Sequence, residues 1–149
     1  MPVFEVVSEN VIHASPEAIY DFVTVPENWN GTHPATGFVS GVQIGRSGQV
    51  GAVWHEHIVV PNETLEAVWT VTTAERGKSW VIETVYFNGL AASVVIEYTL
   101  TPNGDSTHFR RVMNINSPVE ASEEQKKRWT SSEGHDRYLE AVKARLEAA

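Results

Sequence analysis

Two charged residues, Glu83 and Arg111, lie in segments that otherwise have the composition of half-buried β-strands. Pairing these segments through their turns places both charges on the more apolar face of one sheet. A charge that is buried alone costs several kcal/mol, so each residue needs a partner. The two either pair with each other for structural reasons, or they face a ligand, with Arg111 holding a carbonyl or carboxylate and Glu83 acting as a base.

Three turn signals determine the strand pairing behind this placement. Asn88-Gly89 and Asn103-Gly104 are typical of two-residue hairpin turns, and residues 75–77 suit a three-residue loop with its glycine in the left-handed conformation. The resulting pairs are Trp69 with Glu83, Val71 with Val81, Glu83 with Val94, and Tyr98 with Phe109. The inward face so predicted holds Leu65, Ala67, Trp69, Val71, Val81, Glu83, Val85, Val94, Ile96, Tyr98, Leu100, Phe109, Arg111 and Met113.

The strand at 49–60 can face either way, because a shift of one residue in pairing turns every side chain to the opposite face. If Pro61-Asn62 is a two-residue turn, Trp54, Glu56 and Ile58 point inward. A three-residue loop instead turns His55 and His57 inward. We favour the first pairing, because histidines that face solvent cost nothing.

Inward histidines would offer two kinds of chemistry. His55 and His57, joined by His33 and a carboxylate such as Glu83, could hold a metal ion. His33 or His55 could also act as an acid or base, because imidazole titrates near neutral pH. The residues lack the closely spaced ligand sets of zinc motifs, so we expect neither a metal nor a cofactor.

The elements that carry these residues follow a simple order. A first strand at 3–13 precedes a short helix capped by Ser15 with Pro16 at its first position, and a second short turn begins at Pro26. Six strands are expected at 38–44, 49–60, 63–73, 79–87, 90–101 and 106–115, and then one long helix at about 119–147. This order predicts an α+β fold in which the long helix covers an antiparallel sheet.

Composition excludes several classes of protein. The chain has 149 residues, a formal net charge of −8 and no cysteine, which suits one domain over 1–149 and excludes disulfide or thiol chemistry. The acidic balance leads us to expect no nucleic-acid partner. No apolar run approaches the ~20 residues of a membrane span, and nothing resembles a signal peptide. We therefore expect a cytoplasmic protein with no membrane partner.

The order of elements, with "SPEAIYDFV" after the first strand and "GHDRYLEAVKARLE" at the end, resembles the START-like superfamily. This group is also called SRPBCC or birch-pollen-allergen-like, and it includes a polyketide cyclase/dehydrase branch. The resemblance covers nearly the whole chain. It implies a helix-grip fold, in which a curved seven-stranded sheet surrounds the C-terminal helix and leaves a deep ligand cavity. The two short helices and the following loop would line its mouth, with Trp29 and His33 at the rim.

The last helix has an apolar stripe that becomes polar toward its beginning. Leu139, Val142 and Leu146 have core spacing, and the same stripe continues backward through His135, Ser132, Arg128 and Gln125. Either the first turns extend past the sheet into solvent, or they line a wet cavity rather than filling it.

Three functions fit these observations. The first is binding of a small hydrophobic or aromatic molecule, and the second, implied by the resemblance, is a polyketide cyclase or dehydrase in which Arg111 stabilises an enolate and Glu83 or a histidine moves protons. The third is a protein-interaction module. The expected ligand-binding residues are Trp29, Trp54, Glu56, Trp69, Tyr98, Phe109, Met113, Ser132 and His135, and the expected catalytic residues are Glu83, Arg111, His33 and His55.

The opposite face of the sheet also predicts a contact. It would present an apolar patch larger than a monomer usually exposes, which indicates a homodimer. The patch consists of Val68, Trp80, Ile82, Tyr86 and Val95.

Overall fold

The structure is a computed structural model that describes residues 3–34, 36–39, 42, 44–60, 63–87, 93–117, 120 and 122–148. Within these ranges, the side chains at 38, 60, 63, 85–87, 125, 128 and 129 are not described. The strands are β1 (Val3–Ile12), β2 (Thr36–Val39), β3 (Val53–Val60), β4 (Glu63–Glu75), β5 (Ser79–Phe87), β6 (Ser93–Asn103) and β7 (Ser106–Asn116).

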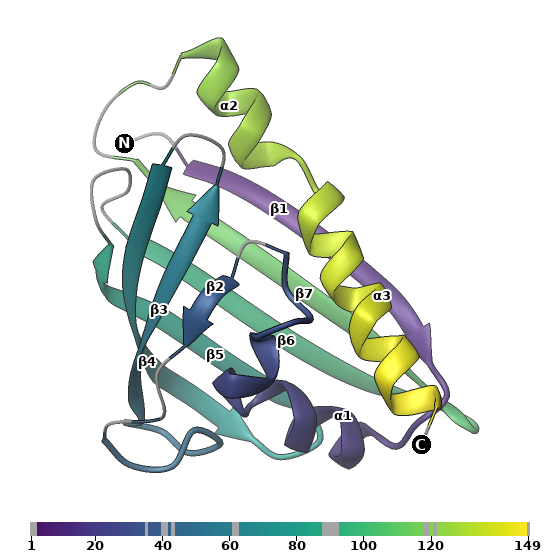
Figure 1. Cartoon of the computed structure of the whole chain (residues 1–149). Helices are drawn as coiled ribbons and strands as arrows, with labels where there is room; N and C mark the ends of the chain where they lie inside the picture. The colour runs from purple at the N-terminus through teal and green to yellow at the C-terminus, as the bar shows by residue number, and fades with distance from the viewer. Residues whose placement is uncertain are drawn as a thin grey trace.

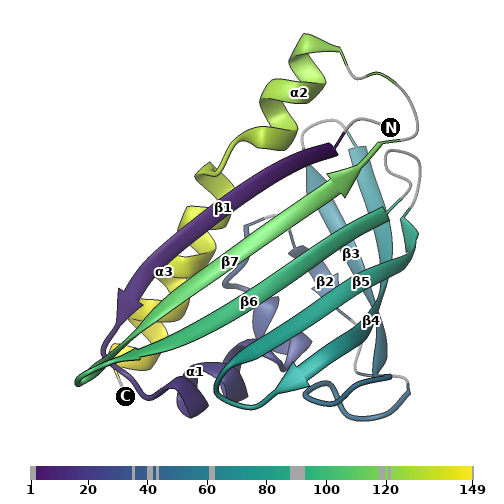
Figure 2. The same ribbon diagram turned by 180° about the vertical axis from the view of Figure 1, so that it is seen from behind.

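The strands form one seven-stranded sheet in the order β1-β7-β6-β5-β4-β3-β2, and all neighbours are antiparallel. The sheet curls, and helix α3 (Glu133–Glu147) lies along its concave side (Figure 1). Seen from behind, no helix covers the outer face of β1, β7, β6 and β5 (Figure 2). This arrangement confirms the predicted helix-grip architecture.

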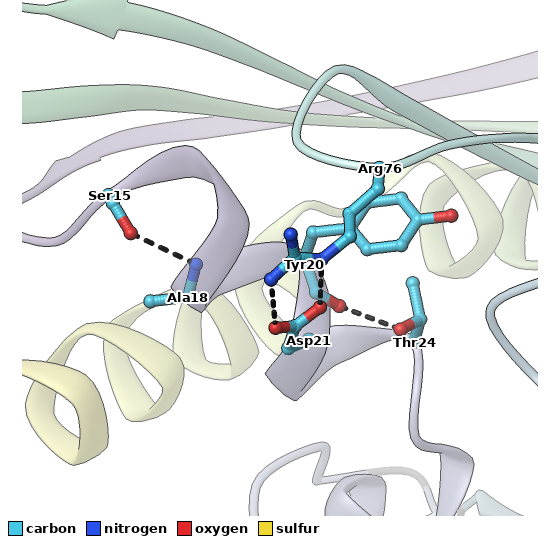
Figure 3. Close-up of polar contacts among 6 residues, drawn as sticks. All are labelled: Ser15, Ala18, Tyr20, Asp21, Thr24 and Arg76. Carbon is cyan, nitrogen blue, oxygen red and sulfur yellow. Dashed lines mark hydrogen bonds and ion pairs between the residues drawn. The ribbon is translucent and has the colours of Figure 1, made fainter.

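The helices after β1 form where the sequence predicts them. The Oγ of Ser15 accepts a hydrogen bond from the Ala18 amide and caps α1 (Pro16–Val23), and a short 3₁₀ helix, η1 (Pro26–Trp29), follows. Figure 3 shows that α1 is also tied to the β4–β5 turn, where Arg76 donates two hydrogen bonds to the Asp21 carboxylate at 2.9 and 2.7 Å. Gly77 in that turn has φ +78°, which confirms the expected left-handed glycine.

The predicted long C-terminal helix is two helices, α2 (Glu123–Thr130) and α3. The break falls at Ser131 and Ser132, after Thr130, whose Oγ1 donates to the Lys126 carbonyl. Hydroxyl side chains compete with the backbone for hydrogen bonds, which favours a helix end at such a cluster. The helical periodicity continues on both sides of the break, so periodicity alone predicted one helix.

Polar contacts from β1 fix the position of α3. The Oγ of Ser8 donates to Asp136 at 2.7 Å, and Nδ2 of Asn10 donates to the Leu139 carbonyl at 3.1 Å. The buried apolar side chains of α3 include Leu139 and Val142, as the core spacing predicts. Together these contacts hold the first half of α3 against β1.

The pairing of β3 with β4 confirms the favoured facing of that strand. Trp54 lies opposite Trp69, and both are buried, whereas His55 lies opposite Val68 on the outer face. Pro61-Asn62 lies outside the described residues, but the pairing of Val60 with Glu63 is the one that a two-residue connection requires.

On β6 and β7 the predicted face is correct and the predicted pairing is wrong by two residues. Tyr98 lies opposite Arg111 rather than Phe109, because the turn is formed by Gly104 and Asp105 instead of Asn103-Gly104. Gly104 adopts φ +63°, which favours glycine at this turn position. A shift of two residues in the pairing leaves every side chain on the same face of the sheet, so the predicted inward face is still correct.

On β5 the predicted face is wrong. Trp80 and Ile82 are fully buried, and Glu83 therefore points to the outer face, where it lies opposite Thr70 and Val95. Irregularities in the β4–β5 pairing, between Val68/Trp69 and between Val71/Thr73, change the alternation. Asn88-Gly89 lies outside the described residues, and the β5–β6 pairing differs by one residue from the pairing that a two-residue turn there would give.

Three tryptophans form the centre of the core. Trp54 and Trp80 stack with ring centroids 5.7 Å apart, and Trp29 meets them edge-on at 5.8 and 6.4 Å. Trp29 is buried, and its Nε1 donates to the Val23 carbonyl at 3.2 Å. It is a core residue and not part of an exposed rim, which corrects the expectation for this side chain.

Among the described residues, no helix combines the length and the apolar character that crossing a bilayer requires.

Candidate functional site

Arg111 is the central polar residue of the interior. It points inward from β7 and is only 5% exposed. Its Nε donates to the Tyr98 hydroxyl at 3.2 Å, and its Nη1 donates to Nδ1 of His135 at 2.7 Å. The guanidinium lies 5.6 and 5.5 Å from the ring centres of Tyr98 and Tyr138. Within the described part of the chain, no carboxylate forms an ion pair with Arg111.

The contact with Arg111 determines the state of His135. A guanidinium can only donate, so Nδ1 of His135 must be the unprotonated acceptor, and in the neutral ring the proton is on Nε2. Burial first and the charge of Arg111 second lower the pKa of His135 from 6.5 to about 3, against a smaller opposite effect of Asp136. At neutral pH His135 therefore presents an N–H donor.

His33 joins the same group of side chains. Its ring centre lies 5.8 Å from that of His135 and 5.0 Å from that of Tyr138. Burial, then Arg111, then His135 hold the pKa of His33 well below its usual value. Both imidazoles are neutral at physiological pH, so neither can donate a proton as an imidazolium.

Tyr138, which the sequence analysis missed, extends the chain of donors. The Tyr98 hydroxyl donates to the Tyr138 hydroxyl at 3.3 Å, and burial raises the pKa of Tyr138 well above its usual value. Position 138 lies three residues after His135 and four before Val142, so it belongs to the stripe on which the sequence analysis placed His135. That spacing is a signal that could have identified it.

Glu56 is the buried carboxyl group of the interior. It is 5% exposed, its Oε1 accepts a hydrogen bond from Nε1 of Trp69 at 3.0 Å, and its Oε2 accepts one from Oγ1 of Thr36 at 2.5 Å. Burial raises its pKa, while the bonds from Thr36 and Trp69 and the charge of Arg111 act in the opposite direction. Thr36 was not predicted, because it lies in a loop-like segment with no pattern to give its facing.

Most of the predicted site residues lie on the inner wall. Trp54, Trp69 and Glu56 come from β3 and β4, and Tyr98 and Phe109 from β6 and β7, with ring centres 5.8 Å apart. Met113 has the same facing as Arg111 on β7 and keeps partial solvent exposure. Ser132 lies at the start of α3, where its Oγ donates to Asp136 at 2.9 Å.

Two predicted catalytic residues are not part of this group. Glu83 is on the outer face, as the pairing of β5 shows. His55 is also on the outer face, where its Nδ1 lies 3.1 Å from Oε1 of Glu66. His55 and His57 both lie on the outer face of β3, whereas His33 packs against His135 and Tyr138 in the interior. The alternative metal site therefore does not form. No group of three His, Asp or Glu side chains suited to a metal occurs among the residues described.

A surface hollow of about 510 Å³ lies elsewhere, between α1, the segment at 46–49 and the end of β4. Its lining includes Tyr20, Asp21, Arg46 and Arg76. The Asp21–Arg76 pair shown in Figure 3 occupies one side of it, and the Tyr20 hydroxyl donates to the Gly48 carbonyl at 3.0 Å. Tyr20, Asp21 and Arg76 thus have hydrogen-bond partners at this hollow, and none of them belongs to the interior group around Arg111.

A seven-stranded antiparallel sheet curled around a C-terminal helix, with polar side chains buried between them, defines a helix-grip protein of the START-like superfamily. Residues 3–147 match the family described as "Polyketide cyclase / dehydrase and lipid transport". The chain belongs to this family, which confirms the resemblance seen in the sequence.

Several known proteins are similar to this chain. Penitrem biosynthesis cluster 1 protein I of Penicillium ochrochloron is 31% identical over 151 residues, with 99% of each chain covered. The protein TTHA0849 of Thermus thermophilus has a TM-score of 0.78 at 12% identity, with 97% of each chain covered. The di-domain ARO/CYC StfQ of the steffimycin biosynthetic pathway has a TM-score of 0.78 at 11% identity, over 98% of this chain and 51% of StfQ. At such identities the two structures establish the fold alone.

Proposed function

We propose that the chain binds a small hydrophobic or aromatic molecule between the inner wall of the sheet and α3. The observation that carries this proposal is the buried guanidinium of Arg111. Its described partners are a phenol and a neutral imidazole, so its charge has no carboxylate at contact distance. A buried charge of this kind is stabilised when an oxygen of a ligand completes its hydrogen bonds.

The walls around Arg111 suit an apolar molecule with one polar end. Aromatic side chains of Tyr98, Phe109 and Trp69 provide the apolar surface, and Nε2–H of His135 adds a donor beside the guanidinium. His33, His135 and Met113 keep partial exposure, and we expect a ligand to enter beside them. The family described for residues 3–147 includes lipid transport, in agreement with an apolar ligand.

A second candidate function is enzymatic, of the cyclase or dehydrase type. One observation favours it: Glu56 and Arg111 lie in the same interior, so an acid or base and a stabiliser of enolate charge are both available. Glu56 takes the place that the sequence analysis gave to Glu83. The relative from the penitrem cluster is named for a biosynthetic pathway, which supports a role in the formation of a natural product.

Binding is tested by titrating the protein with a naphthyl methyl ketone while tryptophan fluorescence is recorded. We expect saturable quenching in the wild type. In the Arg111→Met variant, affinity for the ketone should fall by about tenfold, the value of one charge-assisted hydrogen bond of about 1.5 kcal/mol. Naphthalene, which lacks the oxygen, should bind both proteins equally.

Arg110→Met is the matched control, because Arg110 is the neighbouring residue and lies on the outer face near Glu9. It should leave both affinities unchanged. Absence of saturable binding would refute the proposal, as would equal losses in the Arg110 and Arg111 variants. Enzyme activity is tested separately with a β-hydroxyketone, whose loss of water to give an enone is followed by ultraviolet absorbance. A rate that Glu56→Gln abolishes while binding persists would favour the enzyme.

A further inference from the structure

The described interior contains one buried carboxyl group and one buried guanidinium. Glu56 and Arg111 are the only charged side chains among the buried residues that the structure describes, and each is 5% exposed. The two imidazoles beside Arg111 are neutral at physiological pH. The interior therefore has no net charge when Glu56 is a carboxylate.

The two charges do not contact each other. Glu56 accepts hydrogen bonds from Trp69 and Thr36, while Arg111 donates to Tyr98 and His135. Their fields nevertheless overlap, since Arg111 acts electrostatically on Glu56 and both act on Tyr138. The carboxylate oxygens each have a donor from the protein, whereas three of the five guanidinium N–H groups have no partner among the described residues.

We infer that the site selects a ligand whose polar end is a neutral oxygen acceptor, such as a ketone, ester or ether, over a carboxylate, and that Glu56 sets this preference. The inference rests on the proposed function, because it describes the ligand of that same site. The inference goes beyond the proposed function because it assigns Glu56 as the residue that determines specificity.

The preference follows from the donors and the charges together. The groups that Arg111 and His135 themselves offer are donors, namely the guanidinium N–H groups and Nε2–H of His135, so a ligand atom that meets them must be an acceptor. A neutral oxygen leaves the balance between Glu56 and Arg111 intact. A carboxylate must lose its hydration, and it adds a second negative charge to an interior that already holds the carboxyl group of Glu56, so the attraction of Arg111 is partly cancelled when Glu56 is ionised.

The test compares two probes of nearly equal size and shape, a naphthyl methyl ketone and the naphthoate with the same ring attachment, near neutral pH. We expect the wild type to bind the ketone more tightly. In Glu56→Gln, the ratio of the naphthoate to the ketone dissociation constant should fall by about tenfold, the effect of removing one like-charge interaction at the effective dielectric of a protein. The amide oxygen of glutamine can still accept the bond from Trp69, so the fold is preserved.

Glu97→Gln is the matched control, because Glu97 is an exposed residue of β6 that lies between the buried Ile96 and Tyr98. It should leave the ratio unchanged. Tighter binding of naphthoate than of ketone by the wild type would overturn the inference without any variant, and an unchanged ratio in Glu56→Gln would overturn the role of Glu56. Either result leaves ligand binding itself intact. Failure of both probes to bind at their solubility limits would instead refute the proposed function, and the inference with it.

Discussion

At the residue scale, burial and the charge of Arg111 together set the protonation of the two histidines beside it. The hydrogen bond from Arg111 to Nδ1 selects the tautomer of His135, and burial first and the charge of Arg111 second lower the pKa of both His135 and His33. Tyr98 accepts a bond from the same guanidinium. Burial and this one charge together thus convert two groups that usually titrate near neutral pH into neutral hydrogen-bonding partners.

This control predicts a pH dependence of stability. The pKa of His135 is about 3 in the folded protein and 6.5 ordinarily, so between these values only the unfolded chain binds the proton. The free energy of unfolding should therefore fall as pH falls below 6.5. In urea unfolding, His135→Gln should remove about 1.4 kcal/mol per pH unit from this slope between about pH 5.5 and 4. Glutamine can still accept from Arg111, so the contact remains.

If the free energy of unfolding has the same slope against pH in the wild type and in His135→Gln, the prediction is wrong. A second measurement follows the His135 imidazole by NMR during an acid titration. Its ring resonances should stay at the neutral position down to about pH 4. A midpoint near 6.5 would show that burial and Arg111 do not affect this ring.

The sequence identified Arg111 and His135 because strand alternation and helical spacing give the facing of each. Glu56 entered the site for the same reason, once the favoured facing of β3 proved correct. Its hydrogen bonds could not be predicted, because Thr36 comes from a separate edge strand, β2, that pairs irregularly. The error at Glu83 came from assuming regular pairing along the whole of β5.

At the element scale, the pairing irregularities between β4 and β5 decide which side chains of β5 are buried. Each irregularity adds one unpaired residue to one of the two strands. Beyond that residue, the side chains of the strand alternate between the two faces in the opposite order. The amino-acid sequence of a strand contains no local signal for such a bulge. In β5 both alternating sets contain apolar residues, Trp80 and Ile82 in one and Val81 in the other, so composition did not correct the assumption.

Truncation of neighbouring side chains tests the corrected facing of β5. Trp80 is 0% exposed, stacks on Trp54, and donates from Nε1 to the Ser47 carbonyl at 3.0 Å. Trp80→Ala should lower the free energy of unfolding by about 3–5 kcal/mol, because it leaves a large void in the core. Val81→Ala, on the other face, should cost about 1 kcal/mol or less. The reverse order in urea unfolding would restore the pairing predicted from the turns.

At the scale of the whole molecule, the fold was the most predictable feature. The order of elements and two sequence segments were sufficient to indicate the helix-grip architecture, because covering one apolar sheet with one C-terminal helix admits few alternatives. The break between α2 and α3 and the outer surface were less predictable. Both depend on which side chains meet across the fold rather than on local patterns.

The outer face now predicts a monomer rather than the homodimer that the sequence suggested. Trp80 and Ile82, the largest described members of the expected apolar patch, are in the core. Val68 and Val95 remain on the outer face, but charged residues such as Glu66, Glu83 and Glu97 lie among them. Among the outer-face residues that the structure describes, this mixture does not form the contiguous apolar patch that an obligate interface requires.

Light scattering coupled to size exclusion tests the oligomeric state. We expect a mass of 16.5 kDa, that of one chain, with no change upon dilution. The formal net charge of −8 adds repulsion between copies at low salt, so the measurement should be repeated at high ionic strength, where surface charges are screened. A mass of about two chains under both conditions would contradict the prediction.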